Sequence, residues 1–383
     1  MRGLDRNEKI LVVLIIALKL FAGFFIAYSD VWDVGRLLDI SREKIERNWK
    51  ILGYELVQRP LIEKLGYSFD SISYVGIARQ GYSTSFDDSS DGLFVAYTVN
   101  SLCLYNWPPL YPLMIWFAAG LLGYLPAGLF VSNLASLAAV IAFYRVATEF
   151  IGCKKAFYGS VLLMAYSYNV MSFLSAYSEP VYLVFSILSW REFTRKRYFS
   201  CGLLCLAAAL TRYVGLMLFP IYSVLYLMEK KFKFNRGILK DLTSMNWFLA
   251  GVYLWMFPLA KYQIGYFASE IMDLCYGRGV FTGLGFLTNS IFGLSLLYFA
   301  VLGAYYLKDI DARLSLFSFA FLVFHIAVFG PMDSIGRYIG VIWPLFIYFG
   351  NRFDRTDVVF FPSLLYILGW VVLVLHSNLV GLT

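Results

Sequence analysis

Four short segments of this chain each hold a side chain that could help to move a chemical group, and the last three of them break apolar runs. They are 69–82 with Asp70, 107–112 with Tyr111, 175–180 with Glu179, and 211–215 with Arg212. A carboxylate can take a proton from an attacking hydroxyl, which contributes about 10²–10⁴-fold to a rate. A guanidinium binds phosphate through paired hydrogen bonds and keeps its charge in an apolar site. Together the segments indicate an enzyme that transfers a charged or lipid-linked group.

Asp70 is the candidate base for a sugar hydroxyl that attacks an anomeric carbon. It follows Phe69 and precedes Arg79 in a long polar stretch behind the first apolar run. A solvated loop acid or a helix cap is the simpler reading, since acids are common in loops.

Glu179 is harder to explain as a surface acid, because it lies between two apolar runs. A charged residue at the centre of a membrane helix costs about 2.5–3.5 kcal/mol even on lenient scales, and those that persist are usually functional. The alternative is a helix start, with Pro180 early in the first turn. Both readings can hold together.

Arg212 and Arg337 are the candidates for binding a departing phosphate, and Arg278 is a weaker third. Arg212 interrupts the apolar run 203–218, and Arg337 lies in the polar break 332–338. Snorkelling to the membrane interface is the alternative for Arg212, as is an ion pair with Glu179.

The composition predicts an integral membrane protein. Hydrophobic residues make up 60% of the 383 residues and charged residues 15%, against about 25% in soluble domains. The mean hydropathy is +0.67. The net charge of +7 comes from basic residues in short loops, the pattern of cytoplasmic loops between membrane helices, and no nucleic-acid motif accompanies it.

We expect an all-α polytopic chain of about 11 transmembrane helices, forming one integral unit over 1–383. The predicted spans are 10–28, 128–148, 156–174, 180–194, 199–211, 214–228, 246–262, 288–307, 314–330, 338–350 and 357–377. The segment 108–126, rich in proline at its start, is predicted to be a partial or surface-lying helix. The first extracytoplasmic loop, 29–107, is predicted to carry amphipathic surface helices.

Metal and cofactor chemistry has little support in the sequence. The five cysteines show no zinc spacing, and His325 and His376 lie far apart. Asp87, Asp88 and Asp91 leave a divalent cation possible, although clustered loop acids are usually only solvated. No phosphate-binding glycine loop is present, so a nucleotide donor is not expected.

In order, the motifs of this chain resemble those of the PIG-V family, the GPI mannosyltransferase II enzymes of the GT-C glycosyltransferase class. The resemblance rests on Phe-Asp with a following Gly-Tyr (69–82), Pro-Leu-Tyr-Pro (109–112), Ala-Tyr-Ser-Glu (176–179), Thr-Arg-Tyr-x-Gly (211–215), and Gly-Arg-Tyr before Trp-Pro (336–344). It therefore covers most of the chain. That family usually has tryptophan where Phe69 stands and is longer, so a prokaryotic or archaeal relative in the cell membrane is expected, with the endoplasmic reticulum membrane as the alternative.

This resemblance implies a bundle with an outer loop above it and an inverting transfer of mannose or another hexose. The donor would be a polyprenyl- or dolichyl-phosphate sugar, and the acceptor a glycan or glycolipid. Asp70 would be the base, and Arg212 or Arg337 would stabilise the leaving phosphate. Substrate contacts would come from Glu179, Tyr177, Tyr111 and Arg79.

A transporter or lipid flippase without chemistry is the main alternative, and a scaffold subunit of a larger complex is another. Transporters often contain inverted repeats and broken helices that meet at mid-membrane. No such repeat is seen here, and the polar breaks gather on one predicted face. The enzyme hypothesis requires Asp70, Glu179 and Arg212 to meet at one water-facing mouth.

Overall fold

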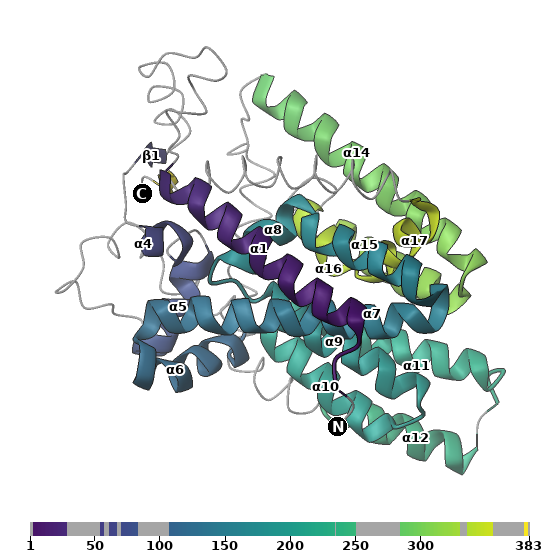
Figure 1. The fold of residues 1–383 in the computed structure, drawn as a ribbon. Coiled ribbons are helices and arrows are strands. Elements are labelled where there is room, and N and C mark those ends of the chain that lie inside the picture. The colour runs from purple at the N-terminus through teal and green to yellow at the C-terminus, as the bar shows by residue number, and fades with distance from the viewer. Residues whose placement is uncertain are drawn as a thin grey trace. The chain divides into compact units, whose positions relative to one another are not determined.

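A computed structural model describes residues 3–28, 54–56, 61–66, 70–82, 107–233, 235–249, 284–329, 335–354 and 379–381 (Figure 1). The chain forms two compact units. The first unit comprises Met1–Ala138, Met164–Val181 and Val359–Thr383, and the second comprises Ala139–Leu163 and Tyr182–Val358.

The described residues are helical apart from one pair of short strands, which confirms the predicted helical class for this part of the chain. The helices are α1 (Arg6–Tyr28), α4 (Leu61–Gly66), α5 (Asp70–Gln80), α6 (Leu110–Leu122), α7 (Tyr124–Ala165), α8 (Ser167–Leu174), α9 (Glu179–Thr194), α10 (Tyr198–Thr211), η3 (Tyr213–Met217), α11 (Leu218–Glu229), α12 (Arg236–Asn246), α14 (Leu284–Tyr306), η4 (Leu307–Asp309), α15 (Ala312–Phe329), α16 (Ile335–Val341) and α17 (Pro344–Arg352). The strands are β1 (Tyr54–Leu56) and β2 (Leu379–Gly381), which pair antiparallel and were not predicted.

In the first unit, α5 and α6 pack against each other, and α1 packs against α4. The α6 helix has 13 residues, so it is about 20 Å long and shorter than the roughly 30 Å core of a bilayer. It starts after Pro109 and ends at Gly123, whose φ of 81° favours glycine. These bounds fit the predicted partial helix, while its place relative to a membrane stays a prediction.

The α7 helix consists of two helical stretches, and the break between them falls between the predicted spans 128–148 and 156–174. Its 42 residues include Gly152, where φ is 72° and the helical path breaks. The predicted span 156–174 is instead divided at Tyr166, between α7 and α8. An average of hydropathy over a window does not register such a turn, because the apolar residues on both sides outweigh Ser167 and Asn169. Both of these polar residues are buried.

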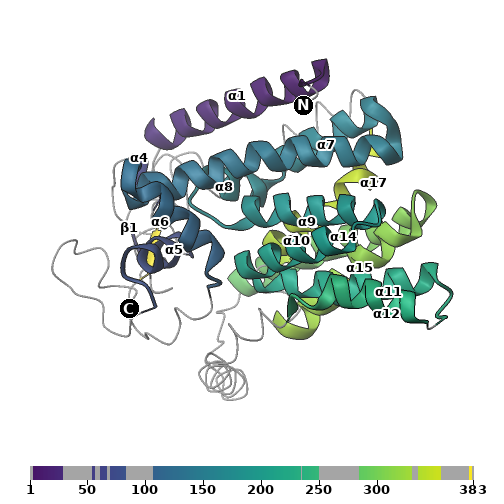
Figure 2. The same ribbon diagram turned by 90° about the horizontal axis from the view of Figure 1, so that it is seen from below.

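In the second unit, aromatic packing joins helices distant in sequence. The Trp190 ring of α9 lies edge-on to Trp343 and Phe317, at centroid distances of 5.8 Å in both cases. The Trp343 indole donates a hydrogen bond of 3.2 Å to Ser186 Oγ. Helices α10, α11 and α12 lie side by side (Figures 1 and 2).

The α12 helix was not predicted. Asn235 caps its start by accepting a hydrogen bond of 2.9 Å from the Ile238 amide. Ile238 and Met245 are buried on one face of the helix. The predicted span 246–262 begins where α12 ends, and most of it lies outside the described residues.

Among the described residues, one helix, α7, is long and apolar enough to cross a membrane by length and composition. The bent pair α8 and α9 would be a second if both belong to one span. The predicted spans 10–28, 180–194, 199–211, 288–307 and 314–330 coincide closely with α1, α9, α10, α14 and α15. The predicted span 357–377 lies outside the described residues, so the number of spans stays a prediction.

Candidate active site

The α5 helix begins at Asp70, so this carboxylate lies at a helix start and not within an open loop. An acid in the first turn stabilises a helix because its charge faces the unbonded amides there. The Asp70 side chain is half-buried, which leaves it accessible to a ligand. The helix-start reading and the predicted catalytic role are therefore compatible.

Tyr74 follows Asp70 by one helical turn and is 2% exposed. Residues four apart lie on the same face of a helix. The Tyr74 hydroxyl shares a hydrogen bond of 2.7 Å with Ser178 Oγ, a residue 104 positions later in the chain. The face of α5 that carries Asp70 is therefore bonded to the residue before Glu179.

Glu179 is the first residue of α9 and is 2% exposed. Pro180 follows it, at a position where a missing backbone N–H costs nothing because helix starts leave those groups unbonded. Taking a carboxylate out of water is costly unless partners compensate the charge. A carboxylate kept in this position, beside the segment bonded to α5, is a strong candidate for a functional group.

A second set of hydrogen bonds fixes the same segment to α7. The Tyr111 hydroxyl donates to the Gly128 carbonyl at 3.0 Å and shares a bond of 2.7 Å with Ser132 Oγ. Ser132 Oγ donates in turn to the Tyr177 carbonyl. The Tyr74 and Tyr111 rings meet edge-on at 4.9 Å, so the two sets of bonds are in contact.

Gly128 is required for this packing. A Cβ atom at this position would lie 3.0 Å from the Cβ of Ala176. Glycine therefore lets α7 approach the 175–178 segment closely enough for Ser132 to reach the Tyr177 carbonyl.

Three predicted substrate-contact residues have different environments. Tyr111 and Tyr177 are fully buried, each 0% exposed, and both take part in the bonding just described. Arg79 is exposed in the last turn of α5. It lies nine residues from Asp70, or about 13 Å along the helix axis. Direct substrate contact by these three residues stays a prediction.

Arg212 belongs to the second unit and lies where α10 gives way to η3. Its backbone is extended, with φ of −149° and ψ of 137°. The Arg212 amide donates to the Ala208 carbonyl at 2.9 Å, and the Gly215 amide donates to the Arg212 carbonyl at 2.8 Å. A Cβ atom at Gly215 would lie 2.4 Å from the Ala208 carbonyl carbon, so only glycine lets this turn fold back on α10.

The structure brings Arg212 to the segment that carries Arg337. The Arg212 guanidinium lies 5.8 Å from the centre of the Tyr338 ring, within the usual range for a cation–π contact. Tyr338 is the neighbour of Arg337 on α16, and its ring also lies 4.2 Å from the ring of buried His325. The two candidate phosphate-binding arginines, 125 positions apart, therefore lie on elements that are joined through Tyr338.

Comparison with known proteins gives only remote similarities. No protein-family profile and no curated protein matches the chain. Among solved structures it is similar to ArnT from Cupriavidus metallidurans bound to undecaprenyl phosphate, with 15% identity, a TM-score of 0.46, and coverage of 90% of this chain and 60% of ArnT. It is also similar to the Archaeoglobus fulgidus oligosaccharyltransferase in complex with Zn and sulfate, with 13% identity, a TM-score of 0.48, and coverage of 98% and 53%.

This chain thus spans little more than half the length of those two proteins. With TM-scores below 0.5, neither establishes a common fold. The expected kinship with PIG-V enzymes therefore stays a prediction.

Asp70 and Glu179 belong to the first unit and Arg212 to the second, so the expected meeting of all three side chains stays a prediction as well. Asp87, Asp88, Asp91 and Arg278 lie outside the described residues. Within the part of the chain that the structure describes, no group of three or more His, Cys, Asp or Glu side chains could hold a metal ion.

No role was predicted for Tyr74 or Ser132, and Ser178 was named only within the motif 176–179. Tyr74 could have been found from its four-residue spacing to Asp70, once 70–80 was assigned as a helix. Ser132 gave no signal, and nothing local indicates the partner of Ser178, which lies 104 positions away in the sequence.

Proposed function

We propose that this chain is a multi-spanning membrane glycosyltransferase of the GT-C class. It transfers a hexose, with mannose as the expected sugar, from a polyprenyl- or dolichyl-phosphate donor to a glycan or glycolipid on the extracytoplasmic face. The observation that carries the proposal is the bond between Tyr74 and Ser178, because it links the helix of Asp70 to the buried Glu179. The elements that carry two acids far apart in sequence are thereby bonded to each other.

In this proposal Asp70 accepts the proton of the acceptor hydroxyl as that oxygen attacks the anomeric carbon. The bond between that carbon and the phosphate oxygen breaks, and the lipid phosphate leaves with the electron pair. A single displacement of this kind inverts the anomeric configuration. It needs one base and no acid, because a phosphate leaves readily without protonation.

Arg212 and Arg337 are proposed to stabilise the departing phosphate, since a guanidinium matches its geometry and stays charged. Glu179 and Tyr177 are proposed to shape the sugar or acceptor site. The apolar composition supports a substrate that is met within a membrane, and so do the apolar helices that match five predicted spans.

The test is transfer by the purified protein in lipid vesicles. Polyprenyl-phosphate mannose and polyprenyl-phosphate glucose, each labelled in the sugar, are supplied with membrane glycolipid as acceptor. Labelled glycolipid is the expected product, and a higher rate with the mannosyl donor would support mannose. Absence of transfer from either donor would contradict the proposal.

Asp70→Asn tests the base, with Asp309→Asn as its matched control. Asp309 is exposed in the second unit, so its neutralisation changes the charge equally without touching the cluster. Asp70→Asn should lower kcat about 10²–10⁴-fold, while Asp309→Asn should keep the parent rate. Equal rates in both variants would remove Asp70 from the base role.

A further inference from the structure

Lys19 is the charged side chain within the otherwise apolar stretch of α1 that follows its polar first turn, Arg6 to Lys9. Ionisable residues within membrane helices are rare and usually mark a function or a specific partner. The proposed transfer gives Lys19 no role.

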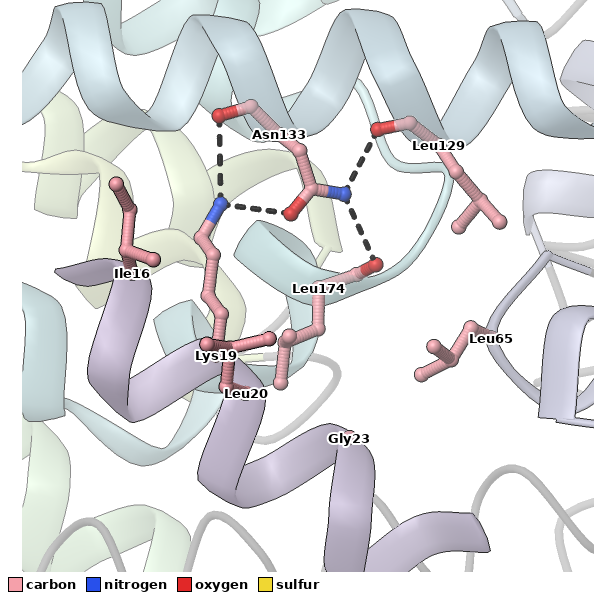
Figure 3. Close-up of a pocket in the computed structure, with 8 residues that line it drawn as sticks. All are labelled: Ile16, Lys19, Leu20, Gly23, Leu65, Leu129, Asn133 and Leu174. Carbon is pink, nitrogen blue, oxygen red and sulfur yellow. Dashed lines mark hydrogen bonds between the residues drawn. The ribbon is translucent and has the colours of Figure 1, made fainter.

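The Lys19 ammonium points toward α7 and is held there by hydrogen bonds (Figure 3). It donates to Asn133 Oδ1 at 2.7 Å, to the Asn133 carbonyl at 3.3 Å, and to Ser136 Oγ. An ammonium has three N–H donors, so each acceptor takes one. The bond to the Asn133 carbonyl is the longest and therefore the easiest to exchange.

These acceptors are neutral, and no carboxylate in the described part of the chain compensates the ammonium. Several described residues form ion pairs, among them Arg197 and Arg313, whereas Lys19 forms none with another described residue. A charge in apolar surroundings is stabilised by a counter-charge far more than by neutral dipoles alone. The site therefore favours an anion.

A cavity of about 240 Å³ opens beside this ammonium. Apart from Lys19 and Asn133 its lining is apolar, namely Ile16, Leu20, Gly23, Leu65, Leu129 and Leu174 (Figure 3). A Cβ atom at Gly23 would meet nothing within 4 Å, so the wall is open at this point.

We propose that this cavity binds a phosphate-bearing lipid, with one anionic oxygen on Lys19 and the start of its hydrocarbon chain along the apolar wall. A cavity of about 150 Å³ already accommodates benzene, so the available volume suits a headgroup edge or a short chain segment. The rest of the lipid would lie outside the cavity. An anion without a chain would leave the apolar wall wet, and a neutral lipid would leave the ammonium uncompensated.

The competing explanation is that Lys19 only anchors α1 to α7, as polar side chains do between membrane helices. Lys19→Gln separates the two explanations, because glutamine keeps donors for Asn133 but removes the charge. Lys9→Gln is the matched control, since Lys9 is exposed on the same helix and its loss changes the net charge equally.

The experiment is native mass spectrometry of the detergent-purified protein titrated with three probes. They are a polyprenyl monophosphate, phosphatidylglycerol and uncharged diacylglycerol. We expect the parent protein and Lys9→Gln to retain one more phosphate-bearing lipid than Lys19→Gln, which should bind that lipid at least tenfold more weakly. Retention of the polyprenyl monophosphate alone would identify a carrier lipid, and retention of phosphatidylglycerol alone would identify a membrane phospholipid. Retention of both would show that the site accepts either, and each of these outcomes supports the proposal.

Equal binding by Lys19→Gln and the parent protein would overturn the proposal, as would equal retention of diacylglycerol. Gly23→Leu provides a second route if Lys19→Gln does not fold, because leucine there fills the cavity and leaves Lys19 in place. That variant should also lose the lipid, and full retention would exclude the cavity. Sugar transfer is not the readout, so the outcome is independent of the proposed activity.

Discussion

The hydrogen bond between Tyr74 and Ser178 gives the sharpest test of the candidate site. Tyr74→Phe removes the hydroxyl but keeps the ring that meets Tyr111 edge-on at 4.9 Å. Ser178→Ala removes the other hydroxyl with almost no change in volume. The two single variants and the double variant complete a thermodynamic cycle with the parent protein.

The magnitude follows from burial, since Tyr74 is 2% exposed and Ser178 is 0% exposed. A neutral hydrogen bond contributes about 1 kcal/mol net, and a buried polar group that loses its partner costs about 1–3 kcal/mol. Each single variant should therefore lose about 1–2 kcal/mol of unfolding free energy. The double variant should lose little more than one single variant, which gives a coupling of about 1 kcal/mol.

The unfolding free energies are measured by denaturant titration in mixed micelles, and kcat and KM for transfer are measured on the same four proteins. We expect kcat to fall in Tyr74→Phe because the helix that carries Asp70 loses its bond to the segment before Glu179. The KM for the donor should change little. Tyr298→Phe is the control, because Tyr298 is 61% exposed and its variant should match the parent.

Additive losses, equal within about 0.3–0.5 kcal/mol, would refute the bond. A folded Tyr74→Phe protein with the parent kcat would refute the link between this bond and the chemistry, whatever the stability data show.

Two further variants test the second unit. Gly215→Ala should lower the unfolding free energy by about 1–3 kcal/mol, because its Cβ would lie 2.4 Å from the backbone of Ala208. The control is Gly120→Ala, whose Cβ would meet nothing within 4 Å and should not destabilise the protein. Thermal unfolding measures both variants, and equal midpoints would contradict the close packing at Gly215. Arg212→Lys keeps the charge but loses the planar fork and its contact with Tyr338, so the KM for the lipid-phosphate donor should rise about tenfold with little change in unfolding midpoint. An unchanged KM would remove Arg212 from the donor site.

The helices were predictable where an apolar run ends in charge or proline. The prediction 180–194 falls one residue short of the start of α9, and 314–330 lies within two residues of both ends of α15. The prediction failed where a run contains a turn, as at 338–350, which the structure divides into α16 and α17. Pro344 starts the second of these helices, as its missing N–H and fixed φ allow. A single proline lowers the mean hydropathy of the run too little to reveal the boundary between the two helices.

The candidate site was predictable only as isolated charges. Glu179 and Arg212 stood out because each interrupts an apolar run, and Asp70 because it lies in the polar stretch behind the first run; both are local signals. The side chains that bond the segments next to Asp70 and Glu179 are serines and tyrosines with no local pattern. Ser178 and Tyr74 are 104 positions apart, so only the tertiary fold shows that they meet.

The segment between α8 and α9 shows why the acid at its end is held firmly. Where the chain leaves a helix in apolar surroundings, its backbone carbonyls need other partners. Asn133 Nδ2 donates to the Leu174 carbonyl at 3.3 Å, and Ser132 donates to the Tyr177 carbonyl. Two neighbouring residues of α7 thus bond the end of α8 and the segment that leads into α9.

Asn133 has a second partner, because its Oδ1 accepts a hydrogen bond from Lys19. The same side chain therefore bonds the break before Glu179 through its amide nitrogen and the lysine of α1 through its oxygen. A site whose charged groups are fixed by such bonds needs little reorganisation when a substrate binds. An anion bound to Lys19 would compete with Asn133 for the same ammonium. A lipid in the proposed cavity would therefore alter the hydrogen bonds of Asn133, which also bonds the segment before Glu179.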